Sequence, residues 1–137
     1  MKNKGNSIDE YYKNIPIVNF PKNLPIIILK IHNTIFERPT IKQCIKIEWK
    51  IKDEKAKMCE ILFGVSRGLI KDIFVLDYIK KSKSVKYRKE LYVTRITDIK
   101  LRNKYVNKLI PYSYRVKGQR SPIRYNFKIE KGVIIYY

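Results

Sequence analysis

The sequence is poor in the residues that build disulfides, metal centres and phosphate-binding loops. It contains two cysteines, one histidine and five glycines in 137 residues. Nothing indicates a secreted scaffold that a disulfide would stabilise, so Cys44 and Cys59 are predicted to be small, buried apolar residues. A zinc site needs more ligands than these cysteines and His32 supply, and the glycines are too scattered for a phosphate-binding loop. No cofactor or metal is expected.

Long apolar runs are also absent. The longest, residues 25–31, is strand-sized and far short of the roughly 20 residues that a membrane span needs. Residues 1–13 are polar and contain acids, unlike a secretory signal or a transit peptide. The expected location is therefore intracellular, cytoplasmic or nuclear, with no membrane partner.

Acidic residues are the third scarcity. The chain has 31 Lys and Arg against 12 Asp and Glu, a formal net charge of +19. Residues 101–126 hold seven basic residues and no acid. A field of this sign attracts polyanions, most often nucleic acid. DNA or RNA is therefore the predicted partner, and an acidic protein or a small nucleotide is the alternative.

The length suits one domain with a modest core, and 45% hydrophobic residues are ordinary for a globular chain. Residues 1–24 lack periodicity and contain Pro16 and Pro21, so they are predicted to form an extended N-terminal arm. Residues 25–137 are expected to form a single α+β domain. Its sheet should be curved and mostly antiparallel, or a small barrel, with two or three helices.

Apolar periodicity and turn residues place the strands. The expected strands and hairpins are a buried strand at 26–31, a hairpin at 59–79 turning at Gly68, a strand at 90–96 and a hairpin built from 123–129 and 133–137. The hairpin at 59–79 should be a central antiparallel pair. Its predicted buried residues include Ile61, Phe63, Ile73 and Val75.

Three helices are expected. Thr40 is a candidate cap for a helix at 40–48, although the alternation at 45–51 would also suit a strand, and a short helix is expected at 52–57. Thr97 or Asp98 should cap a helix at 99–108. Its predicted core-facing residues are Leu101, Tyr105 and Leu109, and its predicted outward residues are Arg102, Lys104 and Lys108. Trp49, the only tryptophan, is predicted to lie in the core.

The stretch YRVKGQRSPIRYNF, residues 114–127, mixes basic and aromatic side chains without an acid. Arginine can fork onto a phosphate or a guanine edge, and tyrosine can stack on unpaired bases. The predicted nucleic-acid-binding residues here are Tyr114, Arg115, Lys117, Arg120, Arg124 and Tyr125, joined by Lys104 or Lys108 from the preceding helix. The alternative is a structural loop in which Arg124 pairs with Asp72 or Asp77 and the tyrosines pack.

Residues 80–89 form a second basic patch, with six basic residues in ten. Like charges repel and stay solvated, so this segment is predicted to be a mobile loop that follows a phosphate backbone. Its predicted binding residues are Lys80, Lys81, Lys83, Lys86, Arg88 and Lys89.

Several short motifs stand out together: Trp49 and Lys50, Gly68 to Phe74, then Lys104, Tyr105, Val106 and Lys108, and finally Gly118, Pro122, Ile123, Arg124 and Tyr125. In this order they resemble a small domain that follows the catalytic module in LEM-domain-type GIY-YIG nucleases. The resemblance covers roughly residues 26–127. Asn107 stands where that domain has a glycine, and the GIY-YIG pair is absent.

The resemblance implies the accessory domain without its nuclease, similar by fold analogy to PUA-like nucleic-acid modules. We therefore expect a non-enzymatic nucleic-acid-binding module. One alternative is a phage- or viral-type counter-defence protein that binds a small nucleotide or an acidic protein. Another is a small metal-independent ribonuclease that uses Arg124 or Tyr125, since no Ser-His-Asp set is evident.

Overall fold

The computed structural model describes residues 12–31, 40–46, 49–83, 85–115 and 122–137. Its elements, in chain order, are β1 (Ile26–Lys30), α2 (Ile41–Lys46), α3 (Asp53–Met58), β2 (Ile61–Ser66), β3 (Leu69–Lys81), β4 (Lys89–Arg95), α4 (Ile99–Tyr105), the 3-10 helix η1 (Tyr112–Tyr114), β5 (Ile123–Tyr125), β6 (Phe127–Glu130) and β7 (Val133–Tyr136). The prediction of a small α+β domain is confirmed.

Five strands form one sheet in the order β4-β3-β2-β1-β5. β1 and β2 run parallel, because the crossover between them contains α2 and α3, and the other neighbours are antiparallel. The described strands therefore form an open mixed sheet and not the small barrel that was the alternative. β6 and β7 form a separate antiparallel hairpin that turns at Gly132.

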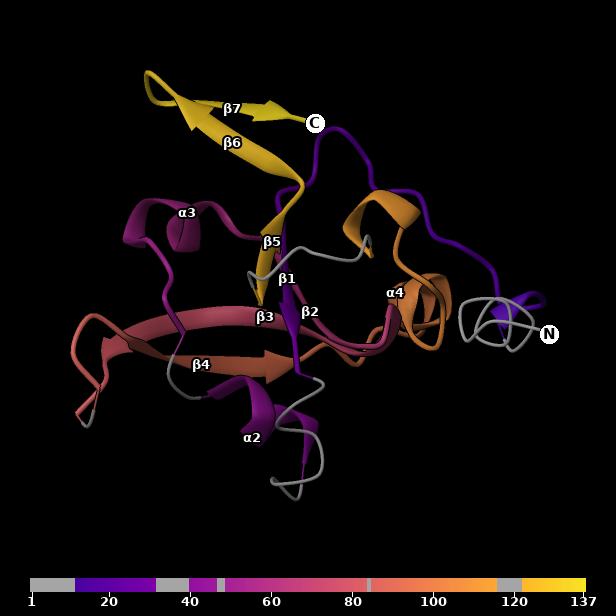
Figure 1. Cartoon of the computed structure of the whole chain (residues 1–137), viewed down its shortest axis with the longest axis horizontal. Helices are drawn as coiled ribbons and strands as arrows, with labels where there is room; N and C mark the ends of the chain where they lie inside the picture. Colours follow the sequence, from indigo (N-terminus) through magenta and orange to yellow (C-terminus); the bar gives the residue numbers. More distant parts are fainter. Residues whose placement is uncertain (1–11, 32–39, 47–48, 84, 116–121) are drawn as a thin grey trace, which may run out of the picture.

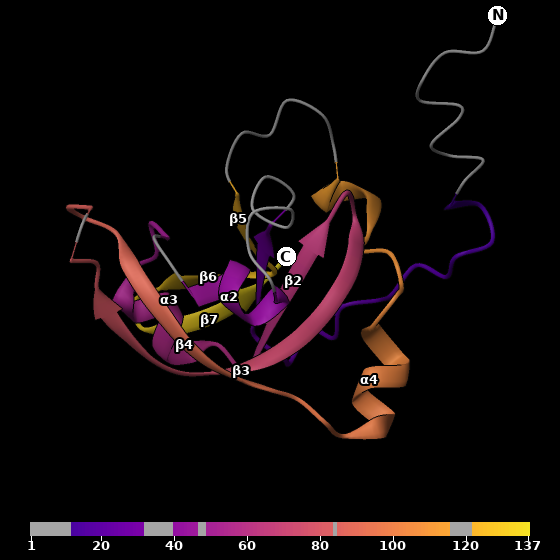
Figure 2. The ribbon, with the colours of Figure 1, turned by 90° about the horizontal axis from the view of Figure 1, so that it is seen from below.

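The sheet separates two clusters of buried side chains, and its curvature gives it a concave and a convex side (Figures 1 and 2). The inner core lies on the concave side, where α2, α3 and the β6–β7 hairpin pack around Trp49 and Phe74. The outer core lies on the other side, where α4 and the segment before β1 pack around Phe63 and Tyr105. Trp49 is buried, as predicted, and its indole N–H donates to the carbonyl of Ile45 at 2.6 Å.

The segment before β1 is extended and lies against the chain that follows α4. Val18 N–H donates to the carbonyl of Leu109 and Leu109 N–H to that of Pro16, both at 2.9 Å. Phe20 meets Phe63 edge-on, with ring centroids 5.6 Å apart. These contacts close the outer core at one end.

The hairpin of β2 and β3 sits centrally in the sheet, as predicted. Its turn contains Arg67 and Gly68, both with positive φ (53° and 84°), the backbone conformation that a tight turn requires. Ile61, Phe63 and Ile73 are buried, as predicted.

β3 is much longer than β2. Its pairing with β2 ends at Phe74, whereas its pairing with β4 continues to Lys81. From Val75 onward, one edge of β3 therefore has no strand partner among the described residues. Val75 is 43% exposed there, because this part of the outer face extends beyond the cover of α4, so the prediction that it is buried is wrong. The β3–β4 hairpin consequently projects from the body of the domain (Figure 2).

α2 and α4 begin at the side-chain caps that were predicted for them, Thr40 and Asp98. The backbone N–H of Gln43 donates to Thr40 Oγ1 at 3.1 Å, and that of Leu101 donates to Asp98 Oδ2 at 3.0 Å. The residues after Asp98 that were predicted to face the core do so. Tyr105 and Leu109 are buried, and Leu101 is partly buried against the outer core. Among the described residues, no helix has the length and apolarity that crossing a bilayer would take.

Asn126 divides the predicted strand 123–129 into β5 and β6. Its side chain is buried and acts as both acceptor and donor: Oδ1 accepts from Ile26 N–H at 2.7 Å and Nδ2 donates to the carbonyl of Leu24 at 2.8 Å. Its carbonyl accepts from Tyr137 N–H at 3.1 Å. One amide side chain thus joins the start of β1 to the point where the chain leaves the sheet for the β6–β7 hairpin.

Replacing Asn126 by Ala should destabilise the protein by about 2–4 kcal/mol, because a buried N–H and a partly buried carbonyl lose their partners. Urea unfolding followed by circular dichroism would measure the loss. Asn103→Ala, at an exposed position of α4, is the matched control and should change stability by less than about 0.5 kcal/mol. Equal effects of the two substitutions would contradict this account of Asn126.

Candidate nucleic-acid interface

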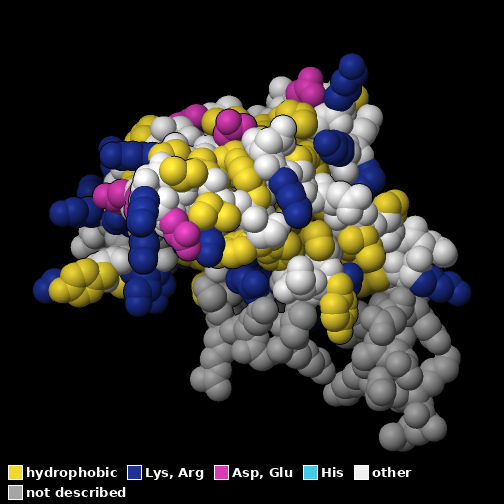
Figure 3. All heavy atoms as spheres, turned by 90° about the horizontal axis from the view of Figure 1, so that it is seen from above, with side chains coloured by type: hydrophobic (Ala, Val, Ile, Leu, Met, Phe, Trp, Pro, Cys, Tyr) yellow, Lys and Arg dark blue, Asp and Glu magenta, His cyan; other side chains and the backbone are white. Residues whose placement is uncertain are grey.

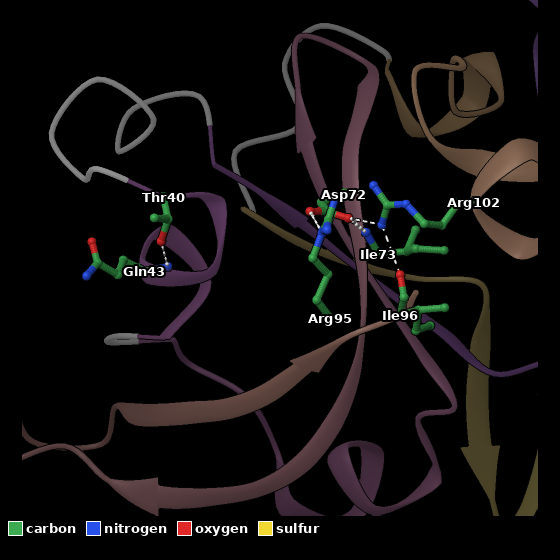
Figure 4. A network of polar contacts seen from close by, with 7 residues as sticks. All are labelled: Thr40, Gln43, Asp72, Ile73, Arg95, Ile96 and Arg102. Atoms are coloured by element: carbon green, nitrogen blue, oxygen red, sulfur yellow. Dashed lines mark hydrogen bonds and ion pairs between the residues drawn. The ribbon is translucent and has the colours of Figure 1, made fainter. Parts of the chain in front are cut away.

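Asp72, a buried carboxylate, holds two of the arginines beyond position 90: Arg102, whose side chain is mostly buried, and Arg95, whose side chain is 54% exposed (Figure 4). Oδ2 accepts from Arg95 Nε at 2.8 Å, and Oδ1 accepts from Arg102 Nη1 at 2.7 Å and from Ile73 N–H at 2.9 Å. Arg102 also donates to the carbonyl of Ile96 at 2.9 Å. The network ties β3, the end of β4 and α4 together.

Arg102 was predicted to face outward, and this is wrong: its side chain is only 20% exposed. A helix that lies across a sheet can turn one long basic side chain under itself when a buried carboxylate receives it. Lys104 does point outward, with its ammonium 5.3 Å from the ring of Tyr105. Lys108 is half-buried and donates to the carbonyl of Asn103. α4 therefore presents one predicted binding residue, Lys104, fully to solvent.

Arg115 is a packing residue. Its Nε donates to the carbonyl of Ile110 at 3.0 Å, and its guanidinium lies 5.4 Å from the ring of Tyr112. Its side chain also fills the space beside Gly68, where a Cβ would lie 2.5 Å from Arg115 Cδ. Gly68 is thus required both by its positive φ and by this close approach.

Arg124 and Tyr125 point to opposite faces of β5, because side chains alternate along a strand. Tyr125 packs against the inner core, with the ammonium of Lys55 4.1 Å from its ring, and burial raises its pKa to about 12. Arg124 lies on the outer side, 5.6 Å from the ring of Tyr114, which itself packs against Phe20. The two tyrosines predicted to stack on bases are therefore half-buried in two different cores.

The structural alternative for this stretch is wrong in one part and confirmed in another: the described residues show no pairing of Arg124 with Asp72 or Asp77, but Tyr114 and Tyr125 do pack, as that alternative predicted. Within the described part of the chain, neither Asp72 nor Asp77 approaches it: Asp72 holds its own two arginines, and Asp77 accepts from Thr94 Oγ1 at 2.6 Å. The predicted partners Lys117 and Arg120 lie outside the described residues. The two described basic residues of the stretch, Arg115 and Arg124, each lie beside a tyrosine ring of η1, Tyr112 and Tyr114 respectively.

The basic segment 80–89 is largely part of a hairpin. Three of its six basic residues lie in strands: Lys80 and Lys81 in β3, and Lys89 in β4. The prediction of a mobile loop over this range is wrong for those residues. Ile79 pairs with Leu91 across the hairpin, and both pack on the inner core, so apolar contacts hold the strands together almost to the tip.

The tip of the hairpin is closed by hydrogen bonds and presents basic residues to solvent. Ser82 N–H donates to the carbonyl of Arg88 at 2.9 Å. Tyr87 has a positive φ of 65° and is 80% exposed, with the ammonium of Lys86 5.3 Å from its ring. Lys83 is exposed as well. The tip therefore combines free positive charge with an exposed aromatic ring.

Lys89 differs from its neighbours because it is held inside the fold. Its ammonium pairs with the carboxylate of Asp53 at the start of α3 and lies 3.5 Å from the carbonyl of Ile51. Its backbone bridges to Trp49 in both directions, at 2.8 and 2.9 Å. Its side chain is 19% exposed. Lys89 thus anchors β4 to α3 and is not available to a ligand.

The stem of the hairpin carries an aromatic pair that the sequence did not reveal. Tyr78 and Tyr92 lie opposite each other on the outer face and stack with centroids 4.6 Å apart and an interplanar angle of 8°. The ammonium of Lys80 lies 5.6 and 5.3 Å from the two rings. Tyr92 donates to Glu90 at 2.9 Å, and this bond raises the pKa of the phenol, which stays neutral.

A groove of about 530 Å³ lies between α3 and the projecting part of β3. Its floor includes Leu76 and Ile79, and Lys57 and Lys81 line it together with Tyr78. It borders the edge of β3 that lacks a described strand partner. The hairpin therefore offers an aromatic outer face, a basic tip and a groove along one edge.

Lys and Arg side chains gather at the hairpin end of the molecule, the left side of Figure 3, with few acidic side chains among them. The described residues contain no group of three His, Cys, Asp or Glu placed to hold a metal ion, and His32 lies outside them. Cys44 is buried, and burial raises the pKa of Cys59 to about 12, which keeps this thiol protonated. The candidate interface therefore consists of basic side chains and exposed aromatic rings.

Comparison of the chain with protein-family models, with curated proteins and with solved structures finds no match. The resemblance to the GIY-YIG-associated domain therefore stays a prediction.

Asp72→Asn should destabilise the fold by about 2–4 kcal/mol, because it leaves Arg102 largely buried without a counter-charge. Urea unfolding would measure this. Asp77→Asn, an exposed carboxylate on the same strand, is the control and should cost less than about 1 kcal/mol. If both cost the same small amount, Asp72 does not organise the junction of β3, β4 and α4.

Proposed function

We propose that this protein is a non-enzymatic nucleic-acid-binding module that uses its β3–β4 hairpin. The observation that carries the proposal is the exposed Tyr78–Tyr92 stack, with Lys80 beside both rings, on a hairpin whose tip is basic. Basic grooves combined with aromatic faces are the usual means of holding unpaired nucleic acid.

The positive charges of the hairpin are free to meet phosphates. Among the described residues, Lys89 is the one basic residue of the six that pairs with a carboxylate, and Glu90 and Asp77 are engaged by a tyrosine and a threonine. Phosphates that replace counterions here would release those ions, which makes binding depend steeply on salt. Lys104 on α4 adds charge on the outer side of the domain.

The stacked tyrosines favour single strands over duplex. The two rings cover one another, so a base would stack on the outer face of Tyr78, which is 51% exposed. Bases in a duplex are already stacked and cannot use such a face, whereas each unpaired base gains about 1–3 kcal/mol by stacking. We infer a preference for single-stranded DNA or RNA without strong sequence specificity.

The alternatives fit the geometry less well. A ribonuclease that used Arg124 and Tyr125 together would need both at one phosphate, and they lie on opposite faces of β5. A trap for a single nucleotide, or a surface for an acidic protein, could use the groove beside Lys81. A small nucleotide neutralises few charges, so its binding would show a shallow salt dependence. The salt slope therefore separates a nucleotide trap from a binder of long polyanions.

Tyr78→Ala should weaken binding of a fluorescent single-stranded oligonucleotide about tenfold or more and leave duplex binding nearly unchanged. Fluorescence anisotropy at two salt concentrations would measure both. Tyr78→Phe keeps the ring that offers the stacking face, so it should bind like the parent. Tyr112→Ala is the matched control, because Tyr112 is 69% exposed but lies on η1, away from the hairpin.

Lys83→Ala and Lys86→Ala should each weaken the binding of DNA and of RNA to the same extent for all sequences. Each should also reduce the slope of log affinity against log salt concentration by about one. Thermal unfolding would check that the variants are folded. The proposal is wrong if the parent shows no salt-dependent binding to any long polyanion, or if Tyr78→Ala and the two lysine variants all bind as the parent does.

A further inference from the structure

Two cations lie side by side at the other edge of the sheet. Ile28 pairs with Arg124 across β1 and β5, and the N–H of Lys30 donates to the carbonyl of Pro122 at 2.8 Å, one hydrogen-bonded pair further along. Because side chains alternate, Ile28, Lys30 and Arg124 project from the same face of the sheet. Ile28 belongs to the outer core, which fixes that face.

This pair has no counter-charge in the part of the chain that the structure describes. Within the described residues neither Lys30 nor Arg124 forms an ion pair, and the buried carboxylate of Asp72 is occupied elsewhere. Burial lowers the pKa of Lys30, and the neighbouring charge of Arg124 lowers it further. The fold therefore holds two like charges together while it removes part of their solvent, an arrangement that disfavours the empty state.

The surroundings hold the guanidinium and leave room in front of it. The guanidinium carbon of Arg124 lies 5.6 Å from the centroid of Tyr114, whose ring packs at 5.2 Å against Phe20. Burial raises the pKa of Tyr114, so its phenol adds no negative charge. A hollow of about 240 Å³, lined also by Tyr137, reaches Arg124 from the edge of β5.

We propose that Lys30 and Arg124 form a phosphate-binding site. The planar guanidinium can donate two parallel N–H bonds to phosphate oxygens, and the ammonium supplies a point charge beside them. A doubly charged anion would offset the repulsion between the two side chains, which a single chloride does less well. The site is separate from the β3–β4 hairpin, because β1 and β5 occupy the opposite edge of the sheet from β3 and β4. Its ligand is a phosphate group, either free or within a nucleic acid.

The test compares the thermal unfolding of the full chain in inorganic phosphate and in chloride at equal ionic strength and pH. Phosphate should raise the melting temperature of the parent by about 4 °C when it is present at ten times its dissociation constant. Arg124→Gln and Lys30→Gln should abolish that shift. In chloride at low ionic strength both variants should melt at or above the parent temperature, because the repulsion is gone.

If Lys30 and Arg124 had a purely structural role, the change in melting temperature in chloride would have the opposite sign, because the variants would then melt below the parent. Arg88→Gln removes one charge from the hairpin tip and should keep the full phosphate shift. Isothermal titration with inorganic phosphate repeats the comparison without heating, which keeps the test valid if one variant folds poorly. The proposal is overturned if the parent shows no shift beyond chloride, or if the shift persists in both Arg124→Gln and Lys30→Gln.

A competition experiment between inorganic phosphate and a bound oligonucleotide distinguishes a free phosphate from a phosphate of a nucleic-acid backbone as the ligand. If inorganic phosphate displaces a bound oligonucleotide from the parent more strongly than from Arg124→Gln, at matched ionic strength, the site holds a backbone phosphate. Equal displacement from both, together with a phosphate shift in the parent, assigns the site to a free phosphate. Because the probe is inorganic phosphate, this site stands or falls independently of binding at the hairpin.

Discussion

The carboxylate of Asp72 is the constraint on which this basic fold depends. It is the acceptor at which β3, the end of β4 and α4 meet. It pairs with the exposed Arg95 and with the mostly buried Arg102, whose charge would cost several kcal/mol if it were left unpaired. Bringing α4 against the sheet then closes the outer core around Tyr105 and Phe63. The chain has few acidic residues, and Asp72 is one of them. Its position gives Arg95 and Arg102 a structural role, whereas arginines without such a partner do not share that role.

The same division runs through the whole molecule and separates charge that builds the fold from charge that can act on a ligand. Lys89 is held by Asp53, 36 residues away in the chain, and Arg115 is held by the carbonyl of Ile110, five residues away. The lysines of the hairpin tip and the Lys30–Arg124 pair have no such partners among the described residues. A count of positive residues therefore overstates the binding surface, and the partner of each side chain has to be identified before a role is given to it.

Much of the fold follows from local patterns, whereas the site depends on distant ones. Caps at Thr40 and Asp98, the turn at Gly68 and the buried runs of β1 and β2 are signals within a few residues, and the structure has them. The Tyr78–Tyr92 stack appears only if residues 80–89 are understood as the end of a hairpin, because then the two tyrosines fall opposite each other. Reading six like charges as a loop hid that pairing. The inward turn of Arg102 could not be seen from helical periodicity, because it is set by Asp72, 30 residues away.

The overhang of β3 beyond β2 has a consequence for how copies of the chain behave toward one another. An unpaired strand edge is a template for another strand, and proteins commonly guard such edges with lysine. Here Lys80 and Lys81 stand at the end of that edge, and the net charge of +19 keeps molecules apart. A bound polyanion would neutralise the charge of Lys80 and Lys81, and it would also bring several protein molecules together on one polymer. Occupancy and self-association are thereby linked, so dense coating of a long polymer would favour condensation, and excess polymer would disperse it.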